Sequence, residues 1–478
     1  MMMVRLWVQT IRSSQRADDG KATLRRPSIS KIFLADWNGP RFLTFGIVVT
    51  LLASLVTLGY YMNEPGIPGD PDTSGYLLVA HKVAHGQFLD PVRTPAYPLF
   101  IDLILLFAGR NNLVAISIAQ GVLYIVAAVG VYGLACLIFH KAWIALVIAV
   151  PVATNVLLIS YVQPIMTEAL ALFLLVCLAL ALVRIAQAPQ PRILWLAMGI
   201  LFALGMTRPE WLYFVVPFVG FVLLVSWKHG AFRQVLPHAL TALVLFSALC
   251  GLYLYGNARQ GYAGFGENQN EDLLGKVMQY HMQNEAPPQY AAITQHVNAI
   301  LALGDENPGH VIFGDPPLES NHFTLAASYG RTIILRHPVE FIADTVPVVF
   351  QSLRSTDPHQ DIRTNGPFSG VLFILQAIAN LVQYSLLVFP FIAVAWWIRL
   401  FLLRRPDALT FAMAGLSLIG GYDLAVTTLF VYTQYARMNV PYDALMITVV
   451  WGSIICAGVA LARSLASKRH AQMPHSMG

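Results

Sequence analysis

The chain has 478 residues, of which 56% are hydrophobic and 12% are charged. Average soluble domains carry about twice that charged fraction, so the composition excludes a soluble globular protein. The formal net charge of +5 is spread over many short segments, which argues against a nucleic-acid-binding surface. All cysteines lie within apolar runs, so no disulfide framework is expected. They are Cys136, Cys177, Cys250 and Cys456.

Long apolar runs recur along the chain, and they predict about ten transmembrane helices because each run can cross a bilayer. The predicted spans are residues 42–61, 113–138, 142–160, 167–186, 192–206, 210–227, 236–256, 368–397, 408–430 and 441–462. We therefore expect an all-α polytopic membrane protein.

Lysine and arginine side chains concentrate in alternate loops between the predicted spans. Cytoplasmic loops of membrane proteins retain positive charge, so this alternation predicts that both termini are cytoplasmic. The expected parts are a basic cytoplasmic tail at 1–41, an N-terminal transmembrane module at 42–256, an extracytoplasmic insertion at 257–367, C-terminal transmembrane helices at 368–462 and a cytoplasmic tail at 463–478.

Two of the predicted outer segments are too long to be simple turns. Residues 62–112 form a first outer loop rich in proline, glycine and aspartate. The insertion at 257–367 contains one expected helix after Asn270, which has the character of an N-cap, and another that begins at Pro338. We therefore expect a mainly helical insertion that lies on the membrane face.

Charged residues at the edges of the spans are the informative ones, because a membrane protein without a polar function does not need them. In the first outer loop, Asp72 stands just ahead of an expected helix and could simply cap it. Asp70 completes an Asp-x-Asp pattern that is compatible with a divalent cation, but such short patterns are common by chance. No cofactor and no metal ligand are therefore firmly predicted.

Other charged residues lie at the outer ends of later spans. Glu168 opens the fourth span, where an acid is favoured by the helix dipole. Arg208 and Glu210 share the next outer turn and could neutralise each other. Each of these residues has a purely structural explanation when it is considered alone.

Arg437 lies in the last outer turn, far from any other basic residue. An isolated guanidinium there needs an anionic partner, either a lipid phosphate or an acid such as Asp423 or Asp443. The predicted topology brings the charged residues of the outer turns to one membrane face. They are Asp72, Arg93, Glu168, Arg208, Glu210 and Arg437. Carboxylates and arginines at a lipid interface can deprotonate a hydroxyl and stabilise a departing phosphate.

Several of these residues occur in a recognisable order. Asp72-x-x-x-Tyr76 is followed by a helical stretch and then by Arg93-Thr94-Pro95-Ala96-Tyr97-Pro98-Leu99-Phe100; Thr167-Glu168, Arg208-Pro209-Glu210 and Arg437…Pro441 follow. In this pattern the chain resembles the GT-C superfamily of membrane glycosyltransferases, in the branch of the protein O-mannosyltransferases and the bacterial aminoarabinose transferase of lipid A. The resemblance is good over roughly the first half of the chain and weaker at its end.

The resemblance implies a GT-C-like bundle with interfacial helices in the first outer loop. It also implies roles: Asp72 as the general base, Arg93 and Arg437 as ligands of the donor phosphate, and Glu168 as a catalytic residue that positions the acceptor or the sugar. We add Arg208 to the phosphate-binding group. The supporting residues are Asp70, Tyr76, Tyr97 and Glu210.

The expected reaction is the inverting transfer of a sugar from a polyprenyl phosphate to an extracytoplasmic lipid, glycan or protein. By the same resemblance, we expect a multi-pass protein of a bacterial inner membrane. The main alternative is a transporter or flippase of a lipid-linked sugar, which favours ionisable residues at mid-span and symmetric halves. Here the spans are nearly free of charge at mid-depth, apart from Asp423, and neither half repeats the other.

Overall fold

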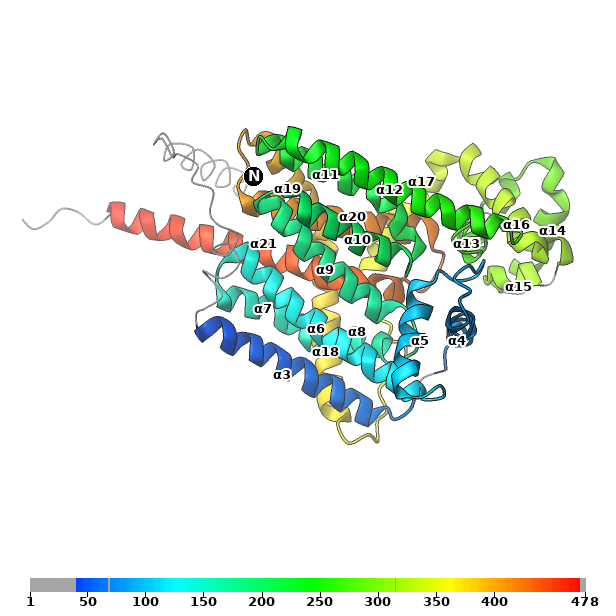
Figure 1. Ribbon diagram of the computed structural model, residues 1–478, viewed down its shortest axis with the longest axis horizontal. Coiled ribbons are helices and arrows are strands. Elements are labelled where there is room, and N and C mark those ends of the chain that lie inside the picture. The colour runs from blue at the N-terminus through cyan, green and yellow to red at the C-terminus, as the bar shows by residue number, and fades with distance from the viewer. Residues whose placement is uncertain (1–39, 68, 263, 314, 473–478) are drawn as a thin grey trace, which may run out of the picture. The chain divides into compact units, whose positions relative to one another are not determined.

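The computed structural model describes residues 40–67, 69–262, 264–313 and 315–472. Most of the predicted tail at 1–41 and the last residues of the tail at 463–478 lie outside these ranges. The described residues form helices and connecting loops without a strand, which confirms the predicted all-α class (Figure 1). The described residues from Phe45 onward belong to one compact unit.

Eight helical segments are long and apolar enough to cross a membrane. They are α3 (Pro40–Asn63), α6 (Leu113–Phe139), α9 (Glu168–Gln187), η1 with α11 (Pro209–Phe214 and Val215–Lys228), α12 (Phe232–Ala258), α18 with η4 and α19 (Ser369–Ser385, Leu386–Val388 and Phe389–Leu402), α20 (Ala408–Phe430) and α21 (Tyr435–Gln472).

The two remaining predicted spans also coincide with helices, but neither is a straight span of full length. Residues 142–160 form α7 (Ala142–Ala153) and α8 (Val156–Val162), which are bent by 53°. Pro151 inside α7 weakens the helix ladder, and the side chain of Asn155 caps α8. Helix α10 (Pro191–Gly205) is apolar but has only 15 residues, fewer than a straight helix normally needs to cross a bilayer.

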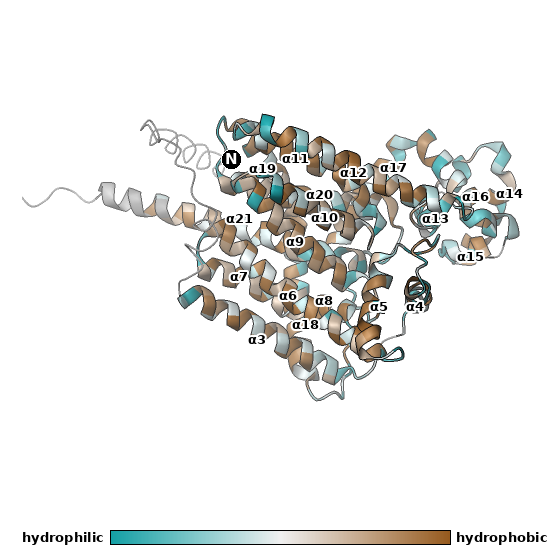
Figure 2. Cartoon of the chain, in the orientation of Figure 1, coloured by the Kyte–Doolittle hydropathy of each residue, from teal (hydrophilic) through white to brown (hydrophobic). Residues whose placement is uncertain are grey.

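Helix α9 lies at the centre of the bundle. Its most apolar window is 72% buried, compared with 17% for α3 and 22% for α12. It packs against α6, α10, α20 and α21, whereas α3 and α12 present apolar side chains outward. Hydrophobic residues accordingly cover the spans, and hydrophilic residues are more frequent in the helices of the insertion (Figure 2). Central burial of α9 fixes the position of its first residue, Glu168.

The first predicted outer loop forms two helices, α4 (Pro71–Ala84) and α5 (Ala96–Ala108). Helix α5 is apolar but too short to cross a bilayer, in agreement with the interfacial helix that we expected. Asp70 is the N-cap of α4, and its Oδ1 accepts a 2.8 Å hydrogen bond from the backbone N–H of Asp72. The possibility that Asp72 caps this helix is therefore wrong, because Asp72 lies inside the first turn.

The insertion is helical, as predicted. It contains α13 (Asn268–Gln279), η2 (Met282–Glu285), η3 (Pro288–Tyr290), α14 (Ala291–Leu301), α15 (Pro308–Phe313), α16 (Pro316–Arg336) and α17 (Pro338–Leu353). These helices share their own apolar core, which includes Leu274, Val277 and Tyr329. The prediction that Asn270 is an N-cap is wrong: Glu267 precedes α13, and Asn270 lies within it.

Helices α4, α5 and α13 to α16 gather at one end of the spans (Figure 1). Helix α13 packs against both α16 and the end of α20. The first loop and the insertion therefore approach the same end of the bundle, where α9 and α21 begin.

Candidate active site

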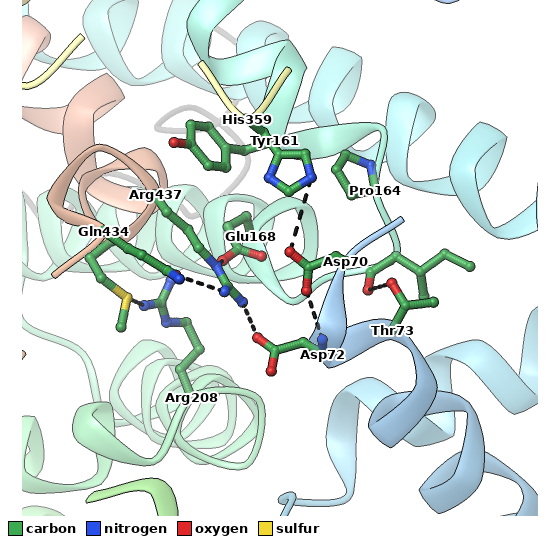
Figure 3. Close-up of polar contacts among 12 residues, drawn as sticks. Asp70, Asp72, Thr73, Tyr161, Pro164, Glu168, Arg208, His359, Gln434 and Arg437 are labelled. Atoms are coloured by element: carbon green, nitrogen blue, oxygen red, sulfur yellow. Dashed lines mark hydrogen bonds and ion pairs between the residues drawn. The ribbon is translucent and has the colours of Figure 1, made fainter. Parts of the chain in front are cut away.

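A cavity of about 330 Å³ lies where the first loop, the insertion and the ends of the spans meet. Its walls come from α4, the α4–α5 loop, the start of α9, the α10–α11 turn, α13 and the start of α21. The predicted site residues that line it are Asp72, Tyr76, Arg93, Glu168, Arg208, Glu210 and Arg437. Residues from distant parts of the chain thus meet in one space (Figure 3).

Asp72 is bound by two arginines. Nη2 of Arg93 donates to its Oδ1, and Nη2 of Arg437 donates to its Oδ2 at 2.7 Å. Burial alone would raise the pKa of the Asp72 carboxyl, but the charges of Arg437 and Arg93 outweigh burial and hold this pKa below its usual range. Asp72 is therefore a carboxylate with both oxygens engaged.

Arg437 also binds Glu168, so that it connects α4 with α9. Its Nε donates to Oε1 of Glu168 at 2.6 Å, and its Nη1 donates to Oε1 of Gln434 at 3.0 Å (Figure 3). The predicted protein partners, Asp423 and Asp443, are wrong. Those acids are buried within α20 and α21, and the anions that neutralise Arg437 are Asp72 and Glu168.

Glu168 is the first residue of α9 and is 1% exposed. Its position in the first turn agrees with the expected helix-dipole interaction. In addition to interacting with the helix dipole, Glu168 forms an ion pair with Arg437 through Oε1. Its second carboxylate oxygen, Oε2, has no hydrogen-bond partner among the described residues. Buried polar atoms are normally satisfied, so this free oxygen in a cavity wall is a candidate contact for a ligand.

Arg208 and Glu210 pair with each other, as the structural interpretation predicted. Nε of Arg208 donates to Oε1 of Glu210 at 2.7 Å. Nη2 of Arg208 contacts the sulfur of Met438 at 2.7 Å, and Nη1 is buried without a partner in the described part of the chain. Arg208 therefore keeps one unused donor although its charge is already neutralised.

The two predicted tyrosines form layers beneath Arg93. The guanidinium carbon of Arg93 lies 4.6 Å from the ring centre of Tyr76, and Tyr97 meets the Tyr76 ring edge-on at 4.9 Å. The hydroxyl of Tyr97 donates to Oε1 of Gln120 at 2.6 Å. Tyr76 lines the cavity, whereas Tyr97 is fully buried behind it and supports Tyr76.

Asp70 does not line the cavity. One of its oxygens caps α4, and the other lies 4.0 Å from Nε2 of His359 (Figure 3). Among the residues that the structure describes, no group of three or more His, Cys, Asp or Glu side chains is arranged to hold a metal ion.

Helix α13 brings two further acids to the cavity, Glu271 and Asp272. Burial and the charge of Asp72 raise the pKa of Glu271. Burial, together with Glu271 and Glu210, raises the pKa of Asp272 well above its usual range, although Lys276 opposes this shift. In the sequence these acids directly follow Asn270 and indicate only the start of a helix, because a sequence pattern does not reveal where the insertion docks.

Two solved structures that are similar to the chain come from Archaeoglobus fulgidus. The apo form of an oligosaccharyltransferase has 13% identity and a TM-score of 0.48, with 89% of this chain and 52% of that chain covered. The oligosaccharyltransferase AglB, in complex with an inhibitory peptide and a dolichol-phosphate, has 11% identity and a TM-score of 0.45, with coverage of 92% and 53%. The chain thus spans about half the length of either protein.

A family model also matches part of the chain. Residues 92–253 match the model of dolichyl-phosphate-mannose-protein mannosyltransferases, and no curated protein matches the chain. The matched segment includes Arg93, Glu168 and Arg208, whereas Asp72 and Arg437 lie outside it. This match confirms the predicted resemblance to the membrane glycosyltransferases of the GT-C superfamily.

Proposed function

We propose that the chain transfers a sugar from a polyprenyl-phosphate donor to a hydroxyl group of an extracytoplasmic acceptor. The observation that carries this proposal is the pairing of Asp72 with Arg93 and Arg437 inside one cavity. A general base and two phosphate-binding groups are what such a transfer needs. The matched family model supports the donor class, because its description names a dolichyl-phosphate sugar.

The arginines bind the donor phosphate in this proposal. A guanidinium presents parallel N–H donors that match phosphate oxygens, and it stays charged in a partly dry site. As the sugar leaves, negative charge grows on the phosphate, and Arg93 and Arg437 stabilise that charge. The unused Nη1 of Arg208 provides a further donor at the same cavity wall.

Donor binding also activates the base. While both arginines hold Asp72, its lowered pKa makes it a weak proton acceptor. A phosphate that competes for the same guanidinium groups weakens their hold on the carboxylate, and the pKa of Asp72 then rises. The free carboxylate accepts the proton of the acceptor hydroxyl at the moment of transfer.

The proposed transfer is a single displacement at the anomeric carbon of the sugar. The acceptor oxygen forms a bond to the anomeric carbon, the bond between that carbon and the phosphate oxygen breaks, and the proton passes to Asp72. The leaving group is the polyprenyl phosphate. Attack from the face opposite the phosphate inverts the anomeric configuration, and the buried Glu168 orients the acceptor or the sugar through its free Oε2.

Transport of a lipid-linked sugar is the second candidate, and one observation favours it. Asp423 and Asp443 are buried within α20 and α21, and ionisable residues inside spans are frequent in transporters. The family match favours the transferase, because its description is that of a transferase.

Reconstitution of the purified protein with polyprenyl-phosphate sugars distinguishes the two. We expect free polyprenyl phosphate to accumulate together with a glycosylated acceptor from a mixture of envelope lipids, glycans and peptides. Movement of the intact donor across the bilayer without release of polyprenyl phosphate would contradict the transferase.

A further inference from the structure

Helix α13 adds two carboxyl groups to the cavity wall that are not paired with the cavity's arginines. The lining contains five carboxylates, of Asp72, Glu168, Glu210, Glu271 and Asp272, and three guanidinium groups, of Arg93, Arg208 and Arg437. The first three carboxylates form ion pairs with arginines. Within the described residues, Glu271 and Asp272 on α13 have neither an ion pair nor a side-chain hydrogen bond.

Lys276 does not form an ion pair with Glu271 or Asp272, although it lies one turn further along α13. Its Nζ contacts Oε1 of Gln279 at 3.0 Å and the hydroxyl of Tyr435 at 3.2 Å. Lys276 is fully buried and does not line the cavity. Among the described residues Asp272 therefore has no paired cation, in agreement with the raised pKa of its carboxyl, and a cation bound in the cavity would favour its ionised form.

A second observation points to a ligand in the same cavity. Oε2 of Glu168 is buried, has no hydrogen-bond partner in the described part of the chain and belongs to a side chain of the cavity wall. A carboxylate oxygen can only accept hydrogen bonds, so its missing partner is a donor. An ammonium group carries three donors and no acceptor, and its positive charge favours the ionised forms of Glu271 and Asp272.

We propose that Glu271 and Asp272 bind an ammonium group of the acceptor while the acceptor hydroxyl lies at Asp72. This inference rests on the proposed function, which assigns Asp72 as the base. Glu271 and Asp72 line the same cavity, so a group held by α13 shares that cavity with the reacting hydroxyl. The donor phosphate would bind at the arginines and would add negative charge, which increases the benefit of a cation on α13.

The test uses the full-length protein and two probes that differ in one group. Ethanolamine carries a hydroxyl and an ammonium, and ethylene glycol carries two hydroxyls. We expect ethanolamine to bind roughly tenfold or more tightly at equal ionic strength, since hydrogen bonds between charged groups are stronger than neutral ones. Titration calorimetry or ligand-dependent thermal unfolding measures the difference.

The double variant Glu271→Gln with Asp272→Asn should remove this preference. Its amide groups keep the size of the carboxyls, and its melting temperature shows whether it folds. Glu319→Gln is the matched control, because Glu319 is an exposed acid of α16 that does not line the cavity. Equal binding of the two probes to the unmodified protein, or an unchanged preference in the double variant, would overturn the proposal.

Two further measurements separate this inference from the proposed function. Binding of polyprenyl phosphate, and its loss in Arg437→Ala, tests the donor site alone. Ethanolamine should still bind when polyprenyl-phosphate mannose occupies the protein, because the acceptor and donor sites are distinct. Competition between the two would assign the ammonium group to the sugar and overturn the acceptor assignment. Normal polyprenyl phosphate binding without ammonium preference would contradict only this inference.

Discussion

Arg437 donates a 2.7 Å hydrogen bond to Asp72, although 365 positions separate the two residues in the chain. The same guanidinium binds Glu168, which is 1% exposed. One arginine from the last span thus neutralises a carboxylate of the first loop and another at the start of the central helix. The proposed phosphate ligand and the proposed base therefore bind each other directly.

The substitution Asp72→Asn separates the function of the base from the binding of the donor phosphate. It removes the base and leaves Arg93 and Arg437 with one fewer competing anion, so donor affinity should stay equal or increase. Turnover should fall by roughly 10²–10⁴-fold, the usual contribution of a positioned acid or base. Donor binding and product formation are measured on the same preparation.

Asp102→Asn provides the matched control for this experiment. Asp102 is an acid of α5 that pairs with Arg110 and does not line the cavity. Its substitution should leave turnover within about twofold, as for a surface ion pair of small energetic value. Full activity of Asp72→Asn would remove Asp72 from the mechanism.

Arg437 is expected to contribute to stability and to donor binding, and a pair of variants separates these contributions. Arg437→Ala leaves the buried charge of Glu168 without a partner, which should cost about 3–5 kcal/mol of unfolding free energy. Adding Glu168→Gln should restore much of that loss but should not restore donor affinity. Arg437→Lys should bind the donor more weakly than the unmodified protein, because an ammonium lacks the forked donors.

Thermal unfolding and binding of polyprenyl phosphate are measured for all three Arg437 variants. Normal donor affinity in the double variant would show that Arg437 is only a structural partner of Glu168. The phosphate ligands would then have to be found among Arg93 and Arg208.

The spans were predictable because their signal is local. A run of apolar residues that is long enough to cross a bilayer forms a helix in lipid wherever it packs. The exceptions also have local causes, such as Pro151 at the bend between α7 and α8. Charges at span ends were identified for the same reason, and the structure gathers Asp72, Glu168 and Arg437 in one cavity.

The pairing of these charges was not predictable, because it depends on which spans become neighbours. From the sequence we expected a lipid phosphate, or an acid such as Asp423 or Asp443, as the partner of Arg437. The central position of α9 brings Glu168 closer instead. The acids of α13 were missed for a related reason: their role depends on where the insertion docks.

Lys276 predicts a dependence of stability on pH. Burial lowers its pKa to about 7, although the charge of Asp272 partly opposes this, whereas the unfolded value is 10.5. The unfolded chain therefore binds the proton more strongly, and stability should rise as pH increases from 7 towards 10.5. In Lys276→Met this rise should be absent, so the variant should gain most relative to the unmodified protein below pH 7.

Unfolding free energies at several pH values test this expectation, and His281→Gln serves as a control on the neighbouring turn. The lost contacts of Lys276 with Gln279 and Tyr435 add an offset that does not depend on its protonation. A constant difference between Lys276→Met and the unmodified protein over this pH range would contradict a buried, weakly basic amine.

Gly275 controls how closely α13 approaches the loop that precedes Arg437. A Cβ atom at this position would lie 2.5 Å from ring atoms of Tyr432 and 2.9 Å from its Cβ, so the loop would have to move. We therefore expect Gly275→Ala to lower the melting temperature and to weaken donor binding, although alanine favours helix by up to about 1 kcal/mol. Thermal unfolding and polyprenyl phosphate binding measure the two effects.

Gly251→Ala is the matched control, because Gly251 lies within α12 and a Cβ there would meet no atom within 4 Å. That substitution should leave donor binding unchanged and should be neutral or slightly stabilising. If Gly275→Ala behaved in the same way, the close contact between α13 and Tyr432 would not position Arg437. A selective loss of donor affinity in Gly275→Ala would instead connect the insertion to the phosphate site, since Gly275 itself does not line the cavity.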